Sequence, residues 1–374
     1  MAAHAKLSAS GAHRWMACPG SVKAEEGLPD RTSSFAEEGT LAHDIVEKAL
    51  RLNVNCDTIC DRPDLEHIIE PAQVYVDYVR ALPGKHRFIE TRVDFSGWVP
   101  GGFGTADAIV IDEDASTLHI ADLKFGKGVR VDAENNPQAM LYALGAYNMF
   151  QFVCDIERVK IAIVQPRIDN ISEWEISVLD LLKWGEIARV AAEETANPKA
   201  KRVPGEKQCR FCKAKATCPA LFRLTEQTLL MDFEAHDDPV APNKLTDEQL
   251  SAALAARPII EAWLNAVETV VKQRLSAGDT VPGWKLVEGR SNRAWINEEE
   301  VAKELEWMLG DKAYTRKLIS PAQAEKAVGK THKAAIEPFV FKPQGKASLA
   351  PENDPRPSIT ANPSDFDDIS EDEP

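Results

Sequence analysis

Two charged residues, Asp122 and Lys124, stand two positions apart at the end of HIADLKFGKG (119–128), a run that otherwise has the composition of a buried strand. Residues i and i+2 of a strand share a face, so this carboxylate and this ammonium would point the same way. Gly126 and Gly128 follow and permit close approach of another chain. Such a pair can serve a divalent cation and an attacking water. Taken alone, D-x-K is common by chance and favours a solvated strand end.

Three further features of the chain fit such a site. Asp107 ends the glycine-rich stretch PGGFGTAD, and it should stand on a strand next to the one that carries Asp122. His43 lies on the edge of the apolar stripe of an amphipathic helix, and Gln138 and Tyr142 share one face of the helix after the Asp-Lys strand. Each also has an ordinary explanation, as a partly buried helix histidine, a turn cap or core-edge residues.

The order of these motifs resembles the RecB-like branch of the PD-(D/E)xK nuclease superfamily. That branch carries G-x-x-x-H on a helix, followed by G-x-x-D, D-x-K and Q-x-x-x-Y. Each motif is weak alone, and the resemblance depends on their order and on the elements that carry them. The matching positions are Gly39 to His43, Gly104 to Asp107, Asp122 with Lys124, and Gln138 with Tyr142.

The resemblance implies a metal-dependent site for phosphodiester cleavage. Asp107 and Asp122 would bind Mg²⁺ or Mn²⁺, joined by the backbone carbonyl of Leu123 and by His43, and an imidazole ligand would favour Mn²⁺. Lys124 would orient or deprotonate the water and stabilise the transition state.

Four other residues complete the expected site. Gln138 and Tyr142 would line the DNA path or position the phosphate, and Glu38 and Glu90 are carboxylates that could approach the metal. We therefore expect a metal-dependent DNA nuclease, most simply an exonuclease of phage recombination or DNA processing. The alternative is a non-catalytic DNA-binding or assembly protein that keeps the fold and the cysteine cluster. The intact motif set argues against this alternative.

The seven cysteines do not suggest a disulfide framework, because their number is odd and we expect a cytoplasmic protein of a bacterial host cell. Three of them form C-x2-C-x5-C, which needs a fourth ligand from elsewhere to complete a four-coordinate site. This layout, with one cysteine in MACPGS upstream, is similar to RecB-like nucleases that carry iron–sulfur clusters. These include AddB-type helicase-nuclease subunits and the nucleases of CRISPR adaptation.

The resemblance implies a structural [4Fe-4S] cluster, and Zn²⁺ on the same thiolates is the alternative. The remaining cysteines, Cys56, Cys60 and Cys154, would stay unligated. The cluster ligands would be Cys18, Cys209, Cys212 and Cys218.

Hydrophobic periodicity predicts an α/β core with a mixed sheet flanked by helices, which the resemblance specifies as restriction-endonuclease-like. A mainly helical C-terminal region follows. The predicted strands cover 87–95, 105–112, 116–125, 158–167 and 172–180. The predicted helices cover about 36–52, 67–82, 137–150, 181–196 and 245–278.

The 374-residue chain is long enough for more than one folded unit. We expect a nuclease core with the cysteine cluster over 1–232, a helical accessory region over 243–346 and a disordered acidic tail over 347–374. The net charge of -15 excludes a generally basic protein, but eight acidic residues and one arginine in 352–374 account for -7 of it. Any DNA site must therefore be a local basic groove.

The accessory region holds Arg290 and Arg293 beside Trp295, which could contact phosphate and stack on a base, or form a solvated hairpin. The expected partners are DNA and a phage single-strand-binding, annealing or helicase protein. No apolar run approaches the roughly 18–20 residues of a membrane span, so we expect no membrane partner. As a whole, the chain resembles an uncharacterised family of phage and prophage proteins.

Overall fold

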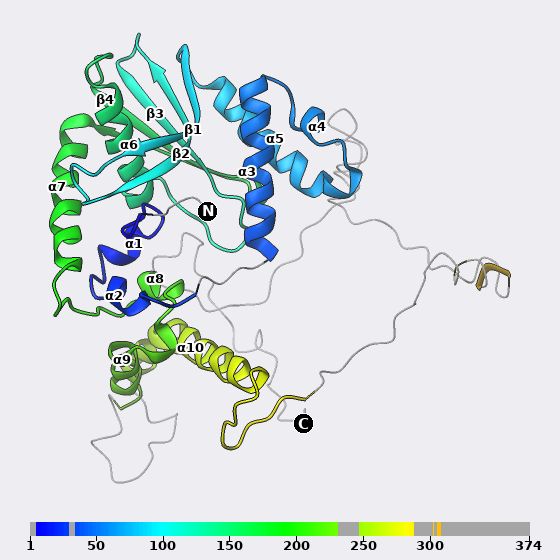
Figure 1. Ribbon diagram of the computed structural model, residues 1–374, viewed down its shortest axis with the longest axis vertical. Helices are drawn as coiled ribbons and strands as arrows, with labels where there is room; N and C mark the ends of the chain where they lie inside the picture. Colours follow the sequence, from blue (N-terminus) through cyan, green and yellow to red (C-terminus); the bar gives the residue numbers. More distant parts are fainter. Residues whose placement is uncertain (1–4, 30–33, 231–246, 288–301, 303–304, 308–374) are drawn as a thin grey trace. The chain divides into compact units, whose positions relative to one another are not determined.

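The computed structural model describes residues 5–29, 34–230, 247–287, 302 and 305–307. Its centre is a mixed sheet with strand order β1-β2-β3-β4-β5, in which β3 and β4 are parallel and the other neighbours antiparallel. Helices cover both faces (Figure 1), which confirms the predicted α/β class. The strands are β1 His86–Asp94, β2 Phe103–Asp112, β3 Thr117–Leu123, β4 Arg158–Gln165 and β5 Asn170–Ser177.

Two helices, α3 (Ser34–Leu52) and α5 (Glu66–Ala81), cover one face of the sheet (Figure 1). The apolar stripe of α3 is buried, with Ile45 almost wholly shielded from solvent, and it packs against α5. Strand alternation turns Ala121 of β3 and Ala162 of β4 toward these helices. Burial of this stripe fixes the orientation of α3 and therefore the position of its polar edge, which carries His43.

The opposite face is covered by α6 (Pro137–Phe150) and α7 (Val178–Thr195). The start of α6 follows from its sequence. The Asn136 side chain accepts a hydrogen bond from the Ala139 N–H at 3.2 Å, and Pro137 fits the first helical position because it needs no N–H partner there. The cap thus fixes the start of α6 and the position of Gln138 in its first turn.

The N-terminal segment packs beside the chain that follows α7. It forms α1 (Ala12–Trp15) and α2 (Ser21–Glu25), and between them the Gly20 N–H donates to the Lys201 carbonyl at 2.9 Å. A Cβ on Gly20 would lie 2.6 Å from the carbonyl oxygen of Ala200, so a larger residue would push the two segments apart.

One long helix and several short ones complete the description. The long helix α10 packs against α9 and η3 and continues through Pro258. The described residues up to Val287 belong to one compact unit. These elements are α4 Cys56–Ile59, η1 Pro63–Leu65, η2 Pro166–Ile168, α8 Glu206–Arg210, η3 Lys215–Thr217, α9 Pro219–Leu230 and α10 Asp247–Ser276.

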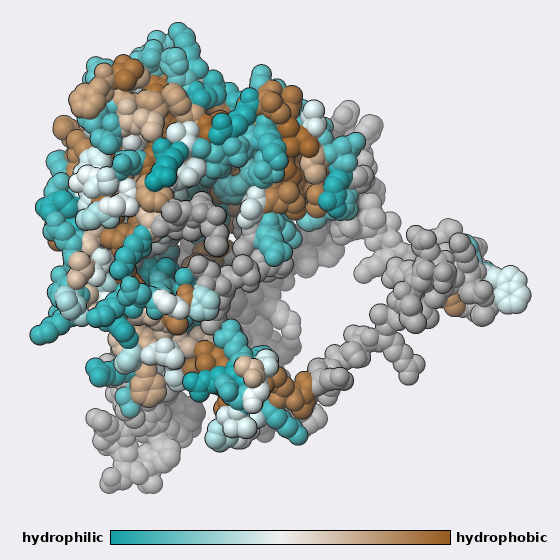
Figure 2. Space-filling model, in the orientation of Figure 1, coloured by the Kyte–Doolittle hydropathy of each residue, from teal (hydrophilic) through white to brown (hydrophobic). Residues whose placement is uncertain are grey.

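Several sequence predictions fall outside the described residues. They are the acidic tail over 347–374, most of the accessory region, and the positions Arg290, Arg293 and Trp295. Within the described residues, no helix has the length and apolar character needed to cross a membrane. On the face shown in Figure 2, hydrophilic residues and separate hydrophobic patches both reach the surface.

Candidate functional site

The sheet and α3 bring one histidine and two carboxylates together. His43 of α3, Glu90 of β1 and Asp107 of β2 have potential ligand atoms that all lie within 4.8 Å of one another. His43 Nδ1 is 3.6 Å from an oxygen of Glu90 and 3.6 Å from an oxygen of Asp107. An imidazole with two carboxylates suits a divalent cation such as Mn²⁺ or Mg²⁺. The structure therefore places His43 and Asp107 together, as predicted, and adds Glu90.

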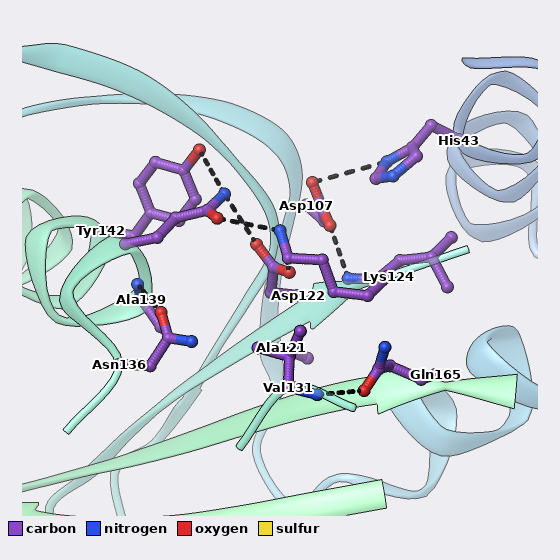
Figure 3. A network of polar contacts seen from close by, with 12 residues as sticks. His43, Asp107, Ala121, Asp122, Lys124, Val131, Asn136, Ala139, Tyr142 and Gln165 are labelled. Atoms are coloured by element: carbon purple, nitrogen blue, oxygen red, sulfur yellow. Dashed lines mark hydrogen bonds and ion pairs between the residues drawn. The ribbon is translucent and has the colours of Figure 1, made fainter. Parts of the chain in front are cut away.

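A second group lies next to this one and is tied by hydrogen bonds (Figure 3). Lys124 Nζ is 2.8 Å from Asp122 Oδ2 and donates to Gln138 Oε1 at 2.9 Å. The Gln138 amide donates to Asp122 Oδ1 at 3.3 Å and to the Tyr142 hydroxyl oxygen at 3.2 Å. The amide thus holds the lysine, the aspartate and the tyrosine in one arrangement.

Asp107 joins the two groups through the backbone. Its Oδ2 accepts a hydrogen bond from the Leu123 N–H at 2.7 Å, while its Oδ1 faces His43 (Figure 3). Lys124 follows the last residue of β3, and its N–H donates to the Val164 carbonyl of β4 at 2.9 Å. The predicted role of the Leu123 carbonyl as a metal ligand stays a prediction.

Glu90 has a backbone conformation that the sequence does not reveal. Its φ is +45°, in the left-handed region that non-glycine residues rarely adopt. The flanking pairs Ile89↔Ala108 and Thr91↔Ala106 place Glu90 opposite Asp107 across β1 and β2. Strain of this kind costs on the order of 1–3 kcal/mol and tends to occur at functional sites.

Glu38 lies at the edge of the site, apart from the group of His43, Glu90 and Asp107. Its carboxylate binds Arg167 of η2 at 2.5 Å, and it is not part of the histidine–carboxylate group found among the described residues. Of the two extra carboxylates considered from the sequence, the structure therefore brings Glu90 into the group and leaves Glu38 beside an arginine.

Burial and like charge shift the proton affinities of the site. Burial raises the pKa of Asp107 to about 7, and the charge of Asp122 adds to this shift. For His43 burial acts against the proton, but Glu90 and Asp107 outweigh it and the pKa is raised. Burial also opposes the charge on Lys124, whereas Asp122 keeps its pKa above the ordinary value. The metal-free site therefore retains protons that a divalent cation would displace.

Two motif glycines differ in what they do. A Cβ on Gly104 would lie 2.6 Å from Tyr142 Cε1, so glycine at this position lets the tyrosine ring lie against β2. A Cβ on Gly39 would meet no described atom within 4 Å. Space therefore explains the glycine before Asp107 but not the glycine before His43.

The four cysteines predicted as ligands line one small cavity between the N-terminal segment and the segment after α7: Cys18, Cys209, Cys212 and Cys218. Backbone N–H groups donate to two of these sulfurs, from Val203 to Cys18 at 3.2 Å and from Gly205 to Cys209 at 3.4 Å. The buried Ser21 hydroxyl lines the same cavity and has no hydrogen-bond partner among the described residues. Backbone N–H groups that donate to sulfur, and a hydroxyl group without a hydrogen-bond partner, suit thiolates that are bound to a metal.

Within the described residues, the sulfurs do not form a compact tetrahedral set. Tetrahedral Zn²⁺ with Zn–S bonds of about 2.3 Å would bring its sulfurs to about 3.8 Å from one another. Among the described residues, no three cysteine sulfurs lie within 4.8 Å of one another. Burial raises the pKa of Cys212 to about 11 and also raises those of Cys18 and Cys209, so these thiols stay protonated at neutral pH when no metal is bound.

A buried ion pair connects the cysteine segment to the N-terminal helices. Arg14 Nε lies 2.9 Å from Glu25 Oε2, and both side chains are largely buried. The same glutamate accepts a hydrogen bond from the Lys213 N–H at 2.8 Å, and Arg14 donates to the Phe211 carbonyl at 3.3 Å.

The remaining cysteines lie away from this cavity, and Cys56 is fully buried in the α3–α5 core.

Fold and site together define an α/β protein with a histidine, carboxylate and lysine centre. Its carboxylates lie in the middle of β1 and β2 and near the end of β3. A family model described as "Protein of unknown function (DUF2800)" matches residues 4–357, so the chain belongs to that family.

Proposed function

We propose that the protein is a metal-dependent DNA nuclease, with exonucleolytic cleavage in phage recombination or DNA processing as its expected role. The observation that supports this function best is the convergence of His43, Glu90 and Asp107 beside the Asp122–Lys124 pair. These residues come from α3 and three neighbouring strands, far apart in sequence.

Each residue has a role that its surroundings support. His43, Glu90, Asp107 and Asp122 would hold Mg²⁺ or Mn²⁺, which when bound supplies charge neutralisation and an acidified water. Lys124, held by Asp122 and Gln138, is placed to orient a water and to stabilise negative charge on a phosphate.

The hydrogen-bonded amide and tyrosine explain how that lysine is kept in position. Gln138 has one oxygen for the lysine and an N–H group for the aspartate and the Tyr142 hydroxyl. The open space around Gly126 and Gly128, where a Cβ would meet no described atom within 4 Å, supports a path for a nucleic-acid backbone.

The four cysteines that line one cavity support a metal centre at that place. We take a [4Fe-4S] cluster as its expected form, and Zn²⁺ on the same thiolates is the alternative. Four cysteine thiolates would leave no open iron position, so the role of such a cluster would be structural. The cluster would hold the N-terminal segment against the segment after α7.

The test is degradation of end-labelled linear DNA, double- and single-stranded, with Mg²⁺ or Mn²⁺. We expect metal-dependent cleavage by the wild type and a loss of about 10²-fold or more in Lys124→Ala, the order of magnitude for a group that acts on a proton. Lys160→Ala is the matched control, because Lys160 is an exposed strand lysine paired with Glu175.

Two outcomes would contradict the proposal. Equal cleavage by Lys124→Ala and wild type would remove the lysine from the chemistry. DNA binding without cleavage in either metal would favour the alternative of a non-catalytic DNA-binding or assembly protein.

A further inference from the structure

A buried arginine that the proposed chemistry does not use lies at the edge of the site. Arg167 belongs to η2, directly after β4, and its side chain is 6% exposed. Its guanidinium carbon lies 5.0 Å from the ring centroid of Phe125, the residue after Lys124. Because β3 and β4 are parallel, both residues lie at the same end of the sheet.

The partner of this arginine is a carboxylate on the helix that carries His43. Arg167 Nη1 donates to Glu38 Oε2 at 2.5 Å, and Glu38 is about one-third exposed. A guanidinium has five N–H donors, and among the described residues Glu38 provides the hydrogen-bond acceptor for them. The pair therefore spans from η2 to α3 and faces solvent on the Glu38 side.

Arg167 is the main cause of a lowered pKa of this carboxylate, and two further basic side chains add to it. Besides Arg167, Lys127 and His67 lie within electrostatic range of Glu38. Lys127 is exposed, between Gly126 and Gly128. Its loop is anchored further along by Gln165, which accepts from the Val131 N–H at 2.7 Å and donates to the Val129 carbonyl at 2.9 Å (Figure 3 shows the first bond).

A carboxylate and a phosphodiester offer a guanidinium similar pairs of oxygen atoms. We propose that Arg167 and Lys127 bind a DNA backbone phosphate next to the phosphate at which the strand is cut. The Glu38 carboxylate occupies the position of this neighbouring phosphate when no DNA is bound. The inference rests on the proposed function, since it concerns the same substrate. A phosphate that displaces Glu38 would leave the guanidinium paired, so its burial would not carry the cost of an isolated charge.

The sign of one mutational effect separates this role from a structural ion pair. If Glu38 competes with phosphate, Glu38→Gln should bind DNA several-fold more tightly than the wild type. If the pair only braces α3 against η2, Glu38→Gln should weaken binding or leave it unchanged. Arg167→Gln and Lys127→Gln should each weaken binding several-fold.

The experiment is fluorescence anisotropy of labelled single- and double-stranded DNA, titrated in EDTA over a range of salt concentrations. We expect Arg167→Gln and Lys127→Gln each to make the slope of log affinity against log salt shallower by about one, as for the loss of one phosphate contact. Glu47→Gln is the control for Glu38, because Glu47 lies on the same helix and pairs with Arg51 at 2.8 Å. Arg189→Gln, an ion-paired arginine of α7, is the control for Arg167.

Each result decides the question. Weaker or equal binding by Glu38→Gln, or unchanged salt slopes in the two cation variants, overturns the proposal. If Arg167→Gln does not fold, Lys127→Gln and Glu38→Gln still give the same test, because both side chains reach solvent. If the wild type cuts and binds DNA but the two cation variants have the same salt slope as the wild type, only this inference is contradicted. If the wild type binds no DNA, the proposed function is contradicted as well.

Discussion

At the scale of single residues, the metal-free site combines two unfavourable features. Glu90 has a left-handed backbone, and Asp107 is a largely buried carboxyl group that faces Glu90 across the sheet and lies near Asp122. Neither feature helps an empty protein to fold, and both would be useful if a cation neutralised the carboxylates. The site should therefore reduce the free energy of unfolding when no metal is bound.

The backbone strain at Glu90 can be measured by comparing two variants. Glu90→Gly and Glu90→Gln both remove the charge, but only glycine adopts a φ of +45° at no steric cost. In EDTA, we expect Glu90→Gly to be more stable than Glu90→Gln by about 1 kcal/mol in urea unfolding. Equal stability, or a more stable glutamine variant, would show that the left-handed conformation is not strained.

The buried carboxyl group of Asp107 predicts a pH dependence of stability. Its pKa rises from 3.8 to about 7 on folding, so the folded state holds the proton more tightly than the unfolded state. The stability that this group contributes is complete below about pH 4 and is lost as the pH rises through 7. In EDTA at pH 8, Asp107→Asn should be more stable than the wild type, on the order of 2 kcal/mol.

The measurement is the urea midpoint of both proteins between pH 4 and 8. The difference between Asp107→Asn and wild type should grow with pH and should shrink when Mn²⁺ is added, because only the wild type offers the cation a carboxylate. Asp180→Asn is the control, since Asp180 is exposed and paired with Lys183. A difference that does not change with pH would contradict the raised pKa.

The sequence predicted part of this site for a physical reason. Asp122 and Lys124 are neighbours along one strand, and Gln138 and Tyr142 are neighbours along one helix, so their proximity follows from local periodicity. The place of Glu90 depends on cross-strand register and on a left-handed φ, neither of which local periodicity contains. The partner of Glu38 was equally hidden, because it lies 129 positions away.

At the scale of elements, the predicted strands and helices of the core are confirmed apart from their ends. Residues 178–180 were predicted as strand and instead begin α7. α3 and α6 begin within two residues of the predicted positions, and α6 has both its asparagine cap and its proline. The end of β3 differs, because the strand stops at Leu123 and Lys124 lies just beyond it. The Lys124 backbone still donates to Val164 of β4, while its side chain reaches Gln138, a contact that strand alternation alone does not predict.

Close packing between elements was also outside the reach of the sequence. Gly145 lies in the middle of α6, where glycine is unfavourable for a helix by about 1 kcal/mol relative to alanine. A Cβ there would lie 2.8 Å from Val93 Cβ of β1, so the glycine lets α6 lie against the sheet. A helix propensity scale records only the cost, since the benefit arises from a strand that precedes the helix by some fifty positions.

At the scale of the whole molecule, the cysteine cavity makes a prediction about colour and stability. Anaerobically purified wild type should contain iron and absorb broadly in the visible, whereas Zn²⁺ has a filled d shell and gives no colour. Cys18→Ser should lose this absorption and lower the midpoint of thermal unfolding, and Cys56→Ser is the control because Cys56 lies in a different core. A colourless wild type with bound zinc would exclude the iron–sulfur cluster.

The contacts of Gly20, Arg14 and Glu25 with residues 201–213 also bear on how the chain is made. A ribosome releases the N-terminal segment long before its binding surface has been synthesised, since domains form as the chain emerges at about 5–20 residues per second. Those first helices must therefore remain exposed, on the order of 10 to 40 seconds, while the five strands are produced. The nascent protein should thus acquire its sheet first and its N-terminal helices last, so that the earliest part of the chain is the last to settle.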